Sequence, residues 1–468
     1  MSWHTNLLFT LSLVPAGSTL SAQALTPVQV AAIDSAVAAV LTGTGAPSAS
    51  IAIVRNGAIA YERAFGKGRI GPDLPATPAM RYAIGSVSKQ FTATAVLLLA
   101  EEGKLSLDDK VAKWFPRLTR ADEVSIRQLL SMTAGYQDYW PQDYVFPLMQ
   151  RPGTAEAIMQ RWAAKPLDFD PGSKWQYSNT NYVIAGAIVE RVSGVPLMDF
   201  MRRRIFTPLA MRSVVDFDSG PLSDQDAAPL LRNALGPLRP AAKEGKGWLF
   251  GAGQLAMTPH DLALWDIAVI DRTLLKAPSY QTQQADMLLT NGLSTRYGLG
   301  LTVTTGFGGR RRITHGGAVS GYTTINDVYP DQRAAVVVLT NIYPGAAGAP
   351  GQIAGRIAAV LFAETDSLTR VARDQARRIY DDLTKGAFDP APFSDNARAY
   401  FTQEVLADYA ASLAPLGPPT EFTATGESLR GGMTIRSYRI RAGGVLMGLT
   451  TMILPDGRIE QYLIERGG

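Results

Sequence analysis

Cysteine is absent from the 468 residues of the chain, and histidine occurs only three times, as His4, His260 and His315. Without cysteine there are no disulfides, iron–sulfur clusters or zinc sites built on thiolates. Three scattered histidines without an HExxH motif do not make a histidine-rich metal centre. We therefore expect neither a metal nor a cofactor in this protein.

Charge is also scarce: charged residues make up 18% of the chain and hydrophobic residues 46%, with a net charge of +4. This composition is typical of a soluble globular protein and excludes a disordered one. The short basic runs 202–204 and 310–312 are typical of solvated surfaces, so we expect no nucleic-acid partner. A chain of this length predicts two domains, and the pattern favours no particular oligomeric state.

The N-terminus resembles an export signal. Residues 7–14 form an apolar run that is too short to span a bilayer, and Ala22-Gln23-Ala24 matches an A-x-A cleavage site. We expect residues 1–24 to be a signal peptide, with an exported chain that begins near Leu25 and is periplasmic or secreted. Because the leading segment has no Lys or Arg, a buried N-terminal helix is the alternative. No other stretch predicts a membrane span.

Residues 25–365 follow an order of helix, hairpin, many helices, three strands and helix. Asn56-Gly57 predicts the hairpin turn, and residues 129–205 read as mostly helical, broken by Asp170-Pro171-Gly172. A sheet built from both ends of this segment, with helices inserted between, is an α+β layout. The expected elements are a helix from Pro27, strands 48–54 and 58–63, a helix Ser86–Glu102, strands 311–314, 322–329 and 334–342, and a helix 352–362.

A second, smaller α+β domain is expected over residues 368–468, because the pattern changes near Leu368. No long flexible linker precedes it. The predicted elements are two helices, 371–383 and 396–413, and four strands, 420–425, 434–441, 445–454 and 459–464.

Ser86 and Lys89 form an S-x-x-K motif at the start of an apolar helix. Side chains at positions i and i+3 of a helix share a face, so Lys89 is expected beside the Ser86 hydroxyl. A partly buried lysine with a lowered pKa is able to take the serine proton and activate the nucleophile. The helix N-terminus adds unpaired N–H groups near the developing negative charge.

Two further motifs fit the same chemistry. Tyr177-Ser178-Asn179 precedes a helix, and the Asn179 amide is suited to a substrate carbonyl or to the lysine. Tyrosine serves as a base if cations hold its phenolate, and Lys89 and His315 are the two cationic or partly cationic neighbours expected to do so. His315-Gly316-Gly317 ends a strand, and its glycines let a substrate approach the backbone as an added strand. The N–H groups of Ser86 and Ala318 would then hold the oxyanion. Taken singly, each motif also fits a structural role, as a helix cap or a strand bulge.

In this order the motifs resemble the serine β-lactamase and penicillin-recognising family, in its class C-like branch. The resemblance covers about residues 25–362. It implies a sheet flanked by helices plus an all-helical lobe, with Ser86 as nucleophile and Lys89 and Tyr177 handling protons. His315 departs from the lysine that β-lactamases usually carry there. The tail resembles NTF2-like accessory domains. Three other stretches look like this family: residues 50–54, 129–135 and 251–255.

The predicted function is a serine hydrolase that cleaves esters or amides of small molecules or short peptides, including D-amino-acid peptides, through an acyl-enzyme on Ser86. Asn179, His315, Gly316, Gly317 and Ala318 are the expected substrate-binding residues. A class C-type β-lactamase is one alternative, and a penicillin-binding sensor that acylates without turnover is another. A third is that the small C-terminal domain carries the function as a ligand pocket.

Overall fold

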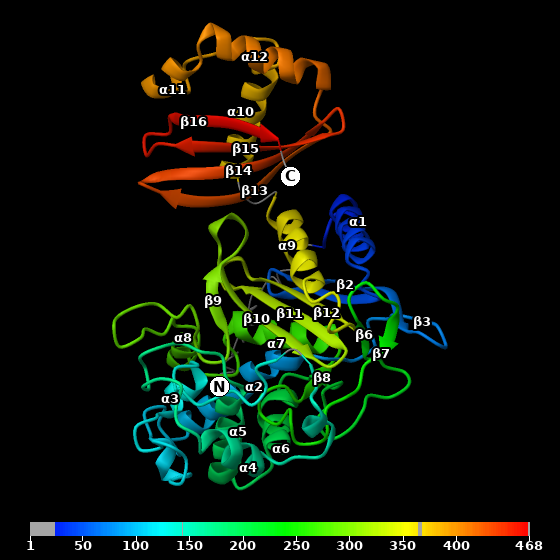
Figure 1. The fold of residues 1–468 in the computed structure, drawn as a ribbon, viewed down its shortest axis with the longest axis vertical. Coiled ribbons are helices and arrows are strands. Elements are labelled where there is room, and N and C mark those ends of the chain that lie inside the picture. The colour runs from blue at the N-terminus through cyan, green and yellow to red at the C-terminus, as the bar shows by residue number, and fades with distance from the viewer. Residues whose placement is uncertain (1–23, 143, 364–366, 467–468) are drawn as a thin grey trace, which may run out of the picture.

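A computed structural model describes residues 24–142, 144–363 and 367–466 (Figure 1). The expected signal peptide therefore lies outside the described residues, apart from Ala24. Helix α1 (Pro27–Thr44) begins where the sequence predicts, with Thr26 as its N-cap and Gln29 completing a capping box. By length and composition α1 is the one described helix that could cross a membrane. One of its faces, with Ile33, Val37 and Val40, is buried against the sheet described next.

A seven-stranded antiparallel sheet joins both ends of the first 362 residues, as predicted. Strands β1 and β12 are buried almost along their whole length because both faces of the sheet are covered. Alternate side chains of β1 enter two different cores: Ile51 lies under α1 and α9, and Ala52 lies on the α7 side. Across the sheet the order is β3 (Leu74–Pro75), β2 (Ala58–Arg69), β1 (Ser48–Arg55), β12 (Ala334–Thr340), β11 (Tyr322–Tyr329), β10 (Arg311–Val319) and β9 (Thr302–Thr305).

Helices cover the two faces differently (Figure 1). Helices α1 and α9 (Ala349–Phe362) lie on one face, and α7 (Pro259–Asp271) lies on the other, next to the helical lobe. The mixed α+β prediction is confirmed. The helices of the lobe are α2 (Ser88–Glu101), α3 (Ile126–Leu130), α4 (Ala155–Ile158), α5 (Asn179–Ser193), α6 (Leu197–Met201) and α8 (Ala277–Gln283). Two small sheets complete this part of the chain. One contains β4 (Tyr82–Ala83), β8 (Leu255–Met257) and β5 (Val215–Asp216), and the other pairs β6 (Leu230–Arg232) with β7 (Leu238–Pro240).

Two sequence predictions were wrong in detail. Residues 129–205 are less helical than predicted, because 131–142, 144–146 and 164–178 run as irregular chain, in which Met132 and Gly135 have positive φ. The predicted break at Asp170-Pro171-Gly172 lies within the last of these stretches. The predicted helix at Ser86 begins at Ser88 instead, preceded by the 3₁₀ turn η1 (Gly85–Val87). Strand β9 was not predicted, and β10 extends through the His315 motif rather than ending before it.

Residues 376–462 form a third core that is separate from the other two. In Figure 1 this part lies above the seven-stranded sheet, and β13 contacts the 3₁₀ turn η6 (Phe307–Gly309). All four predicted strands are present. The elements are α10 (Ser367–Leu383), α11 (Asp395–Tyr400), α12 (Gln403–Leu413), β13 (Glu421–Arg430), β14 (Met433–Ala442), β15 (Val445–Ile453) and β16 (Ile459–Arg466), with the strands paired in sequence order.

We propose that residues 25–365 and 368–468 fold as separate domains, because their apolar side chains gather in separate cores. A chain that ends at residue 366 is therefore expected to be soluble, to unfold cooperatively and to hydrolyse a small ester. Thermal unfolding and an esterase assay check this. An insoluble or inactive product would mean that the tail completes the first core or its site.

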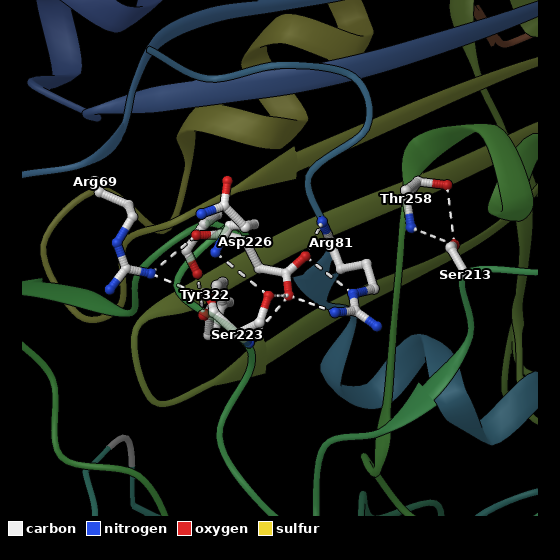
Figure 2. Close-up of polar contacts among 9 residues, drawn as sticks. Arg69, Arg81, Ser213, Ser223, Asp226, Thr258 and Tyr322 are labelled. Carbon is white, nitrogen blue, oxygen red and sulfur yellow. Dashed lines mark hydrogen bonds and ion pairs between the residues drawn. The ribbon is translucent and has the colours of Figure 1, made fainter. Parts of the chain in front are cut away.

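A carboxylate ties the loop before β6 to the start of the helical lobe (Figure 2). Asp226 accepts hydrogen bonds from Arg81 Nε at 2.9 Å and Nη2 at 2.6 Å, and from the Arg81 backbone N–H at 3.0 Å. The N–H and hydroxyl of Ser223 complete its shell at 3.0 and 2.6 Å. Burial works to raise the pKa of Asp226, but the hydrogen bonds from Arg81 and Ser223 outweigh burial and lower it.

Asp226→Ala should lower the free energy of unfolding by about 3 kcal/mol at pH 7, because it leaves Arg81 unpaired and largely buried. A lowered folded-state pKa gives stability that is present above the unfolded carboxyl pKa, about 4, and is lost as the pH falls through the folded value. The deficit of the variant should therefore shrink in acid. Urea unfolding of the wild type and the variant at several pH values measures this difference in the free energy of unfolding. Asp224→Asn is the control, since Asp224 is 96% exposed; equal losses would contradict the assignment.

Candidate active site

Ser86 lies in the turn η1, which packs against β10 at the boundary between the sheet and the helical lobe. Gly85 has a φ of 50°, and a Cβ there would come within 2.7 Å of the Ala318 nitrogen. Gly317 faces the same turn so closely that a Cβ would stand 1.9 Å from the Ile84 oxygen. Both glycines are therefore required for β10 to approach the backbone of Ser86.

Lys89 is fully buried one turn after Ser86, and its ammonium nitrogen has three oxygen neighbours. Its Nζ lies 2.9 Å from Ser86 Oγ, 2.8 Å from Asn179 Oδ1 and 2.8 Å from the Ala252 carbonyl oxygen. Burial lowers the pKa of Lys89 to about 7, although the carboxylate of Asp138 works to raise it. A substantial fraction of Lys89 is therefore a neutral amine at neutral pH.

The neutral amine has two N–H groups and one lone pair to place among these three neighbours. Asn179 Oδ1 and the Ala252 carbonyl oxygen accept only, so they take the two N–H groups. The lone pair is then directed at Ser86, whose hydroxyl is the one neighbour able to donate. This arrangement suits proton transfer from Ser86 to Lys89.

Tyr177 is half-buried in the wall of the site, with its ring centroid 4.9 Å from Lys89 Nζ. Burial raises the pKa of Tyr177, although a hydrogen bond with Ser86 works to lower it. Burial therefore works against the phenolate held by two cations that the sequence predicts, because desolvation outweighs the neighbours. At neutral pH Tyr177 is a phenol, which donates rather than accepts a proton.

His315 is buried within β10 and is neutral. Its Nδ1 lies 2.6 Å from the Gly316 carbonyl oxygen and its Nε2 lies 2.9 Å from the Tyr297 hydroxyl. A carbonyl only accepts, so Nδ1 carries the hydrogen and Nε2 accepts from Tyr297. Burial and the nearby Lys89 lower the pKa of His315 to about 4. The second expected cation is absent, and the hydrogen-bond partner of the imidazole is Tyr297 rather than Tyr177.

The backbone of β10 is open on one edge beside the serine. Strand β9 pairs only with residues 311–314, so the edge from His315 to Ala318 has no strand partner among the described residues. Gly316 is exposed there. An extended substrate would fit this edge, with backbone hydrogen bonds of the kind that strand addition uses.

A cavity of about 850 Å³ brings most of the predicted residues together. Lys89 lies beneath its floor. The structure places no group of three His, Cys, Asp or Glu where a metal could be held, within the ranges it describes. The predicted residues that line the cavity are Ser86, Tyr177, Asn179, His315, Gly316, Gly317 and Ala318.

Sequence reasoning missed two residues of this site. Asp138 lines the cavity and contacts Asn179, and Tyr297 lies behind His315. Neither belongs to a recognisable motif. Each meets its partner through a tertiary contact that spacing along the chain does not encode.

The family model described as Beta-lactamase matches residues 33–360, more than half of the chain. The chain belongs to the beta-lactamase family. Members of this family include serine hydrolases, and the matched range contains Ser86, Tyr177 and His315 with their motifs. The model ends before the tail, so the NTF2-like resemblance stays a prediction.

Known relatives support the same family. Penicillin-binding protein 4* of Bacillus subtilis (strain 168) is 27% identical over 305 residues, which are 62% of this chain and 67% of that protein. A D-aminopeptidase of Brucella anthropi is 26% identical over 335 residues, 70% of this chain and 62% of that protein. The solved octameric penicillin-binding protein homologue of Pyrococcus abyssi has the same fold, with a TM-score of 0.63 and 23% identity over 93% of this chain and 100% of that one.

Proposed function

We propose that this member of the beta-lactamase family hydrolyses esters or amides through an acyl-enzyme on Ser86. The contact of 2.9 Å between Lys89 Nζ and Ser86 Oγ carries the proposal, together with the burial that leaves Lys89 partly neutral. Lys89 takes the proton as Ser86 Oγ bonds to the substrate carbonyl carbon. The N–H groups of Ser86 and Ala318 hold the oxyanion.

The second half of the reaction returns the proton. The carbonyl re-forms, the bond to the alcohol or amine leaving group breaks, and the leaving group takes the proton from Lys89. The Tyr177 phenol, which hydrogen-bonds with Ser86, is a second donor beside this path. Water then attacks the acyl carbon and gives a proton to Lys89. The bond between the acyl carbon and Ser86 Oγ breaks, and Ser86 Oγ takes that proton from Lys89. Asn179 holds the amine of Lys89 in position throughout.

The charge of the cavity favours substrates without a free carboxylate. His315 is neutral and its two nitrogens are engaged, and of the described residues that line the cavity none is a lysine or arginine. The Asp138 carboxylate lines it and repels an anion. A β-lactam carries a carboxylate, whereas simple esters and D-amino-acid amides do not. The name of the Brucella anthropi relative, a D-aminopeptidase, agrees with this choice.

Purified protein should therefore cleave p-nitrophenyl butyrate or D-alanine p-nitroanilide with a kcat/KM about ten- to a hundredfold above that for nitrocefin. The difference corresponds to one missing charge-assisted hydrogen bond to the carboxylate. Parallel assays on the three substrates decide the matter. Nitrocefin hydrolysis near 10⁵ M⁻¹s⁻¹, with negligible cleavage of the others, would promote the class C-type β-lactamase instead. A stable adduct without turnover would favour the penicillin-binding sensor.

The protein acts outside the cytoplasm in this proposal, because its first residues carry the export pattern described above. The intact mass of the protein recovered from the periplasm of a two-membrane host should correspond to a chain beginning near Leu25. A mass that includes Met1 would contradict export with cleavage.

A further inference from the structure

Asp138 joins the irregular chain after α3 to the first residue of α5. Helix α5 begins at Asn179, and its N-cap Ser178 makes no side-chain cap. Asp138 takes that role from a distant segment, because its Oδ1 accepts the Asn179 N–H at 2.9 Å and the Trp140 N–H at 3.2 Å. A negative charge at a helix N-terminus is also favoured by the helix dipole.

The same carboxylate fixes which way the Asn179 amide faces. Asn179 Nδ2 donates to Asp138 Oδ1 at 3.2 Å and to Oδ2 at 3.3 Å. A carboxylate accepts only, so the NH₂ end of the amide must face Asp138 and the Oδ1 end must face Lys89, 2.8 Å away. A flipped amide would place its N–H groups against the amine of Lys89. One N–H group of Lys89 would then have no acceptor.

Asp138 is also the carboxylate whose charge works to raise the pKa of Lys89. The titratable side chains that face Lys89 are Asp138, Tyr177, Tyr182 and His315. Burial raises the pKa values of both tyrosines and lowers that of His315, so these three are neutral at pH 7. Burial raises the pKa of Asp138, although the N–H groups of Trp140 and Asn179 and the charge of Lys89 work to lower it. The hydrogen bonds that reach Asp138 come from N–H donors, which an ionised carboxylate accepts.

We propose that Asp138 is a positioning residue for the Ser86–Lys89 pair: it orients the Asn179 amide so that the Lys89 lone pair is aimed at Ser86, and its charge sets the proton affinity of Lys89. The inference rests on the proposed function, since it assigns Lys89 as the base. Asp138 acts through Asn179 and does not touch the reacting atoms in this scheme.

Two substitutions separate orientation from charge. Asp138→Asn keeps an oxygen for both Asn179 contacts and removes the charge, whereas Asp138→Ala removes both. Kinetics should show a plateau kcat about a hundredfold lower in Asp138→Ala, because a misaimed lone pair disrupts a near-attack geometry. Asp138→Asn should keep its plateau within about fivefold. In both variants the acid limb of kcat should move about one pH unit lower, because the attraction that favoured the protonated amine is gone.

A second readout does not depend on turnover. Carbon-13 NMR of the lysine Cε atoms should show one of the eleven lysines titrating near pH 7, and Lys89→Met assigns it. The pKa read from that titration should be lower in Asp138→Asn and unchanged in the control Asp170→Asn, since Asp170 is an exposed partner of Arg120. A Lys89 titration that does not move, or an Asp138→Ala enzyme with the wild-type plateau, overturns the proposal. If the wild type hydrolyses nothing while the titration still moves, the proposed function fails and the charge assignment stands.

Discussion

Ser86→Ala is expected to abolish turnover, with kcat lower by about 10⁵- to 10⁶-fold. Removing a nucleophile leaves only binding and oxyanion stabilisation, and losses of that size follow in other serine hydrolases. The fold should persist because Ser86 lies in a short turn, half-exposed to the cavity, where alanine causes no strain. Hydrolysis of the best substrate measures the loss. A fluorophosphonate should add mass to the wild-type peptide that contains Ser86 and should leave the variant unlabelled.

Ser178→Ala is the matched control for that experiment. Ser178 lies between Tyr177 and Asn179, is 1% exposed, and its hydroxyl has no hydrogen-bond partner. It should keep both the label and nearly all of the activity. Persistent labelling of Ser86→Ala, or activity lost equally in the two variants, would remove Ser86 from the nucleophile role.

Much of the fold follows from short-range patterns. Asn56 and Gly57 adopt the positive φ values of 54° and 78° that the hairpin turn requires, and the first helix begins at Pro27, as expected. The apolar runs of β1 and β12 were readable because a strand covered on both faces needs apolar side chains at every position. These features depend on neighbours in sequence, which is why the sequence predicts them.

The segment 131–178 shows where such patterns fail. Its apolar residues suggest a helix, yet the chain wraps around the cavity and presents Asp138 and Tyr177 to it. Positive φ at Met132 and Gly135 interrupts the helical path. The carbonyl oxygens of Met132, Thr133 and Gly135 accept hydrogen bonds from backbone N–H groups of residues 168–176 instead of from the next helical turn. Tertiary context therefore overrides helix propensity where a site must be built.

The candidate site was also predictable only in part. The spacing of three places Lys89 beside Ser86, and the structure agrees at 2.9 Å. The protonation states of Tyr177 and His315 could not be predicted from the sequence, because they depend on how deeply each side chain is buried. Desolvation raises the pKa of Tyr177 and lowers that of His315, the reverse of a site in which a cation stabilises a phenolate. Our proposal therefore assigns the role of the base to Lys89.

Lys89→Met should lower kcat/KM by about 10³- to 10⁴-fold, at the upper end of what a general base contributes. Methionine fills the buried volume without a charge, although it leaves Asn179 Oδ1 and the Ala252 carbonyl oxygen without a donor. In the wild type, kcat/KM should rise tenfold per pH unit up to about pH 7 and then level off, because only the neutral amine accepts the proton of Ser86. In Lys89→Met this acid limb should disappear.

Tyr177→Phe distinguishes the two proton carriers. If Lys89 is the base, the phenylalanine variant loses a hydrogen-bond donor, so its plateau should fall by about ten- to a hundredfold while the limb near pH 7 stays in place. If Tyr177 were the base, the limb would vanish in this variant and persist in Lys89→Met. The two pH profiles, recorded on one ester across pH 5 to 9, therefore assign the base directly: the buried amine retains the role only if the limb follows Lys89.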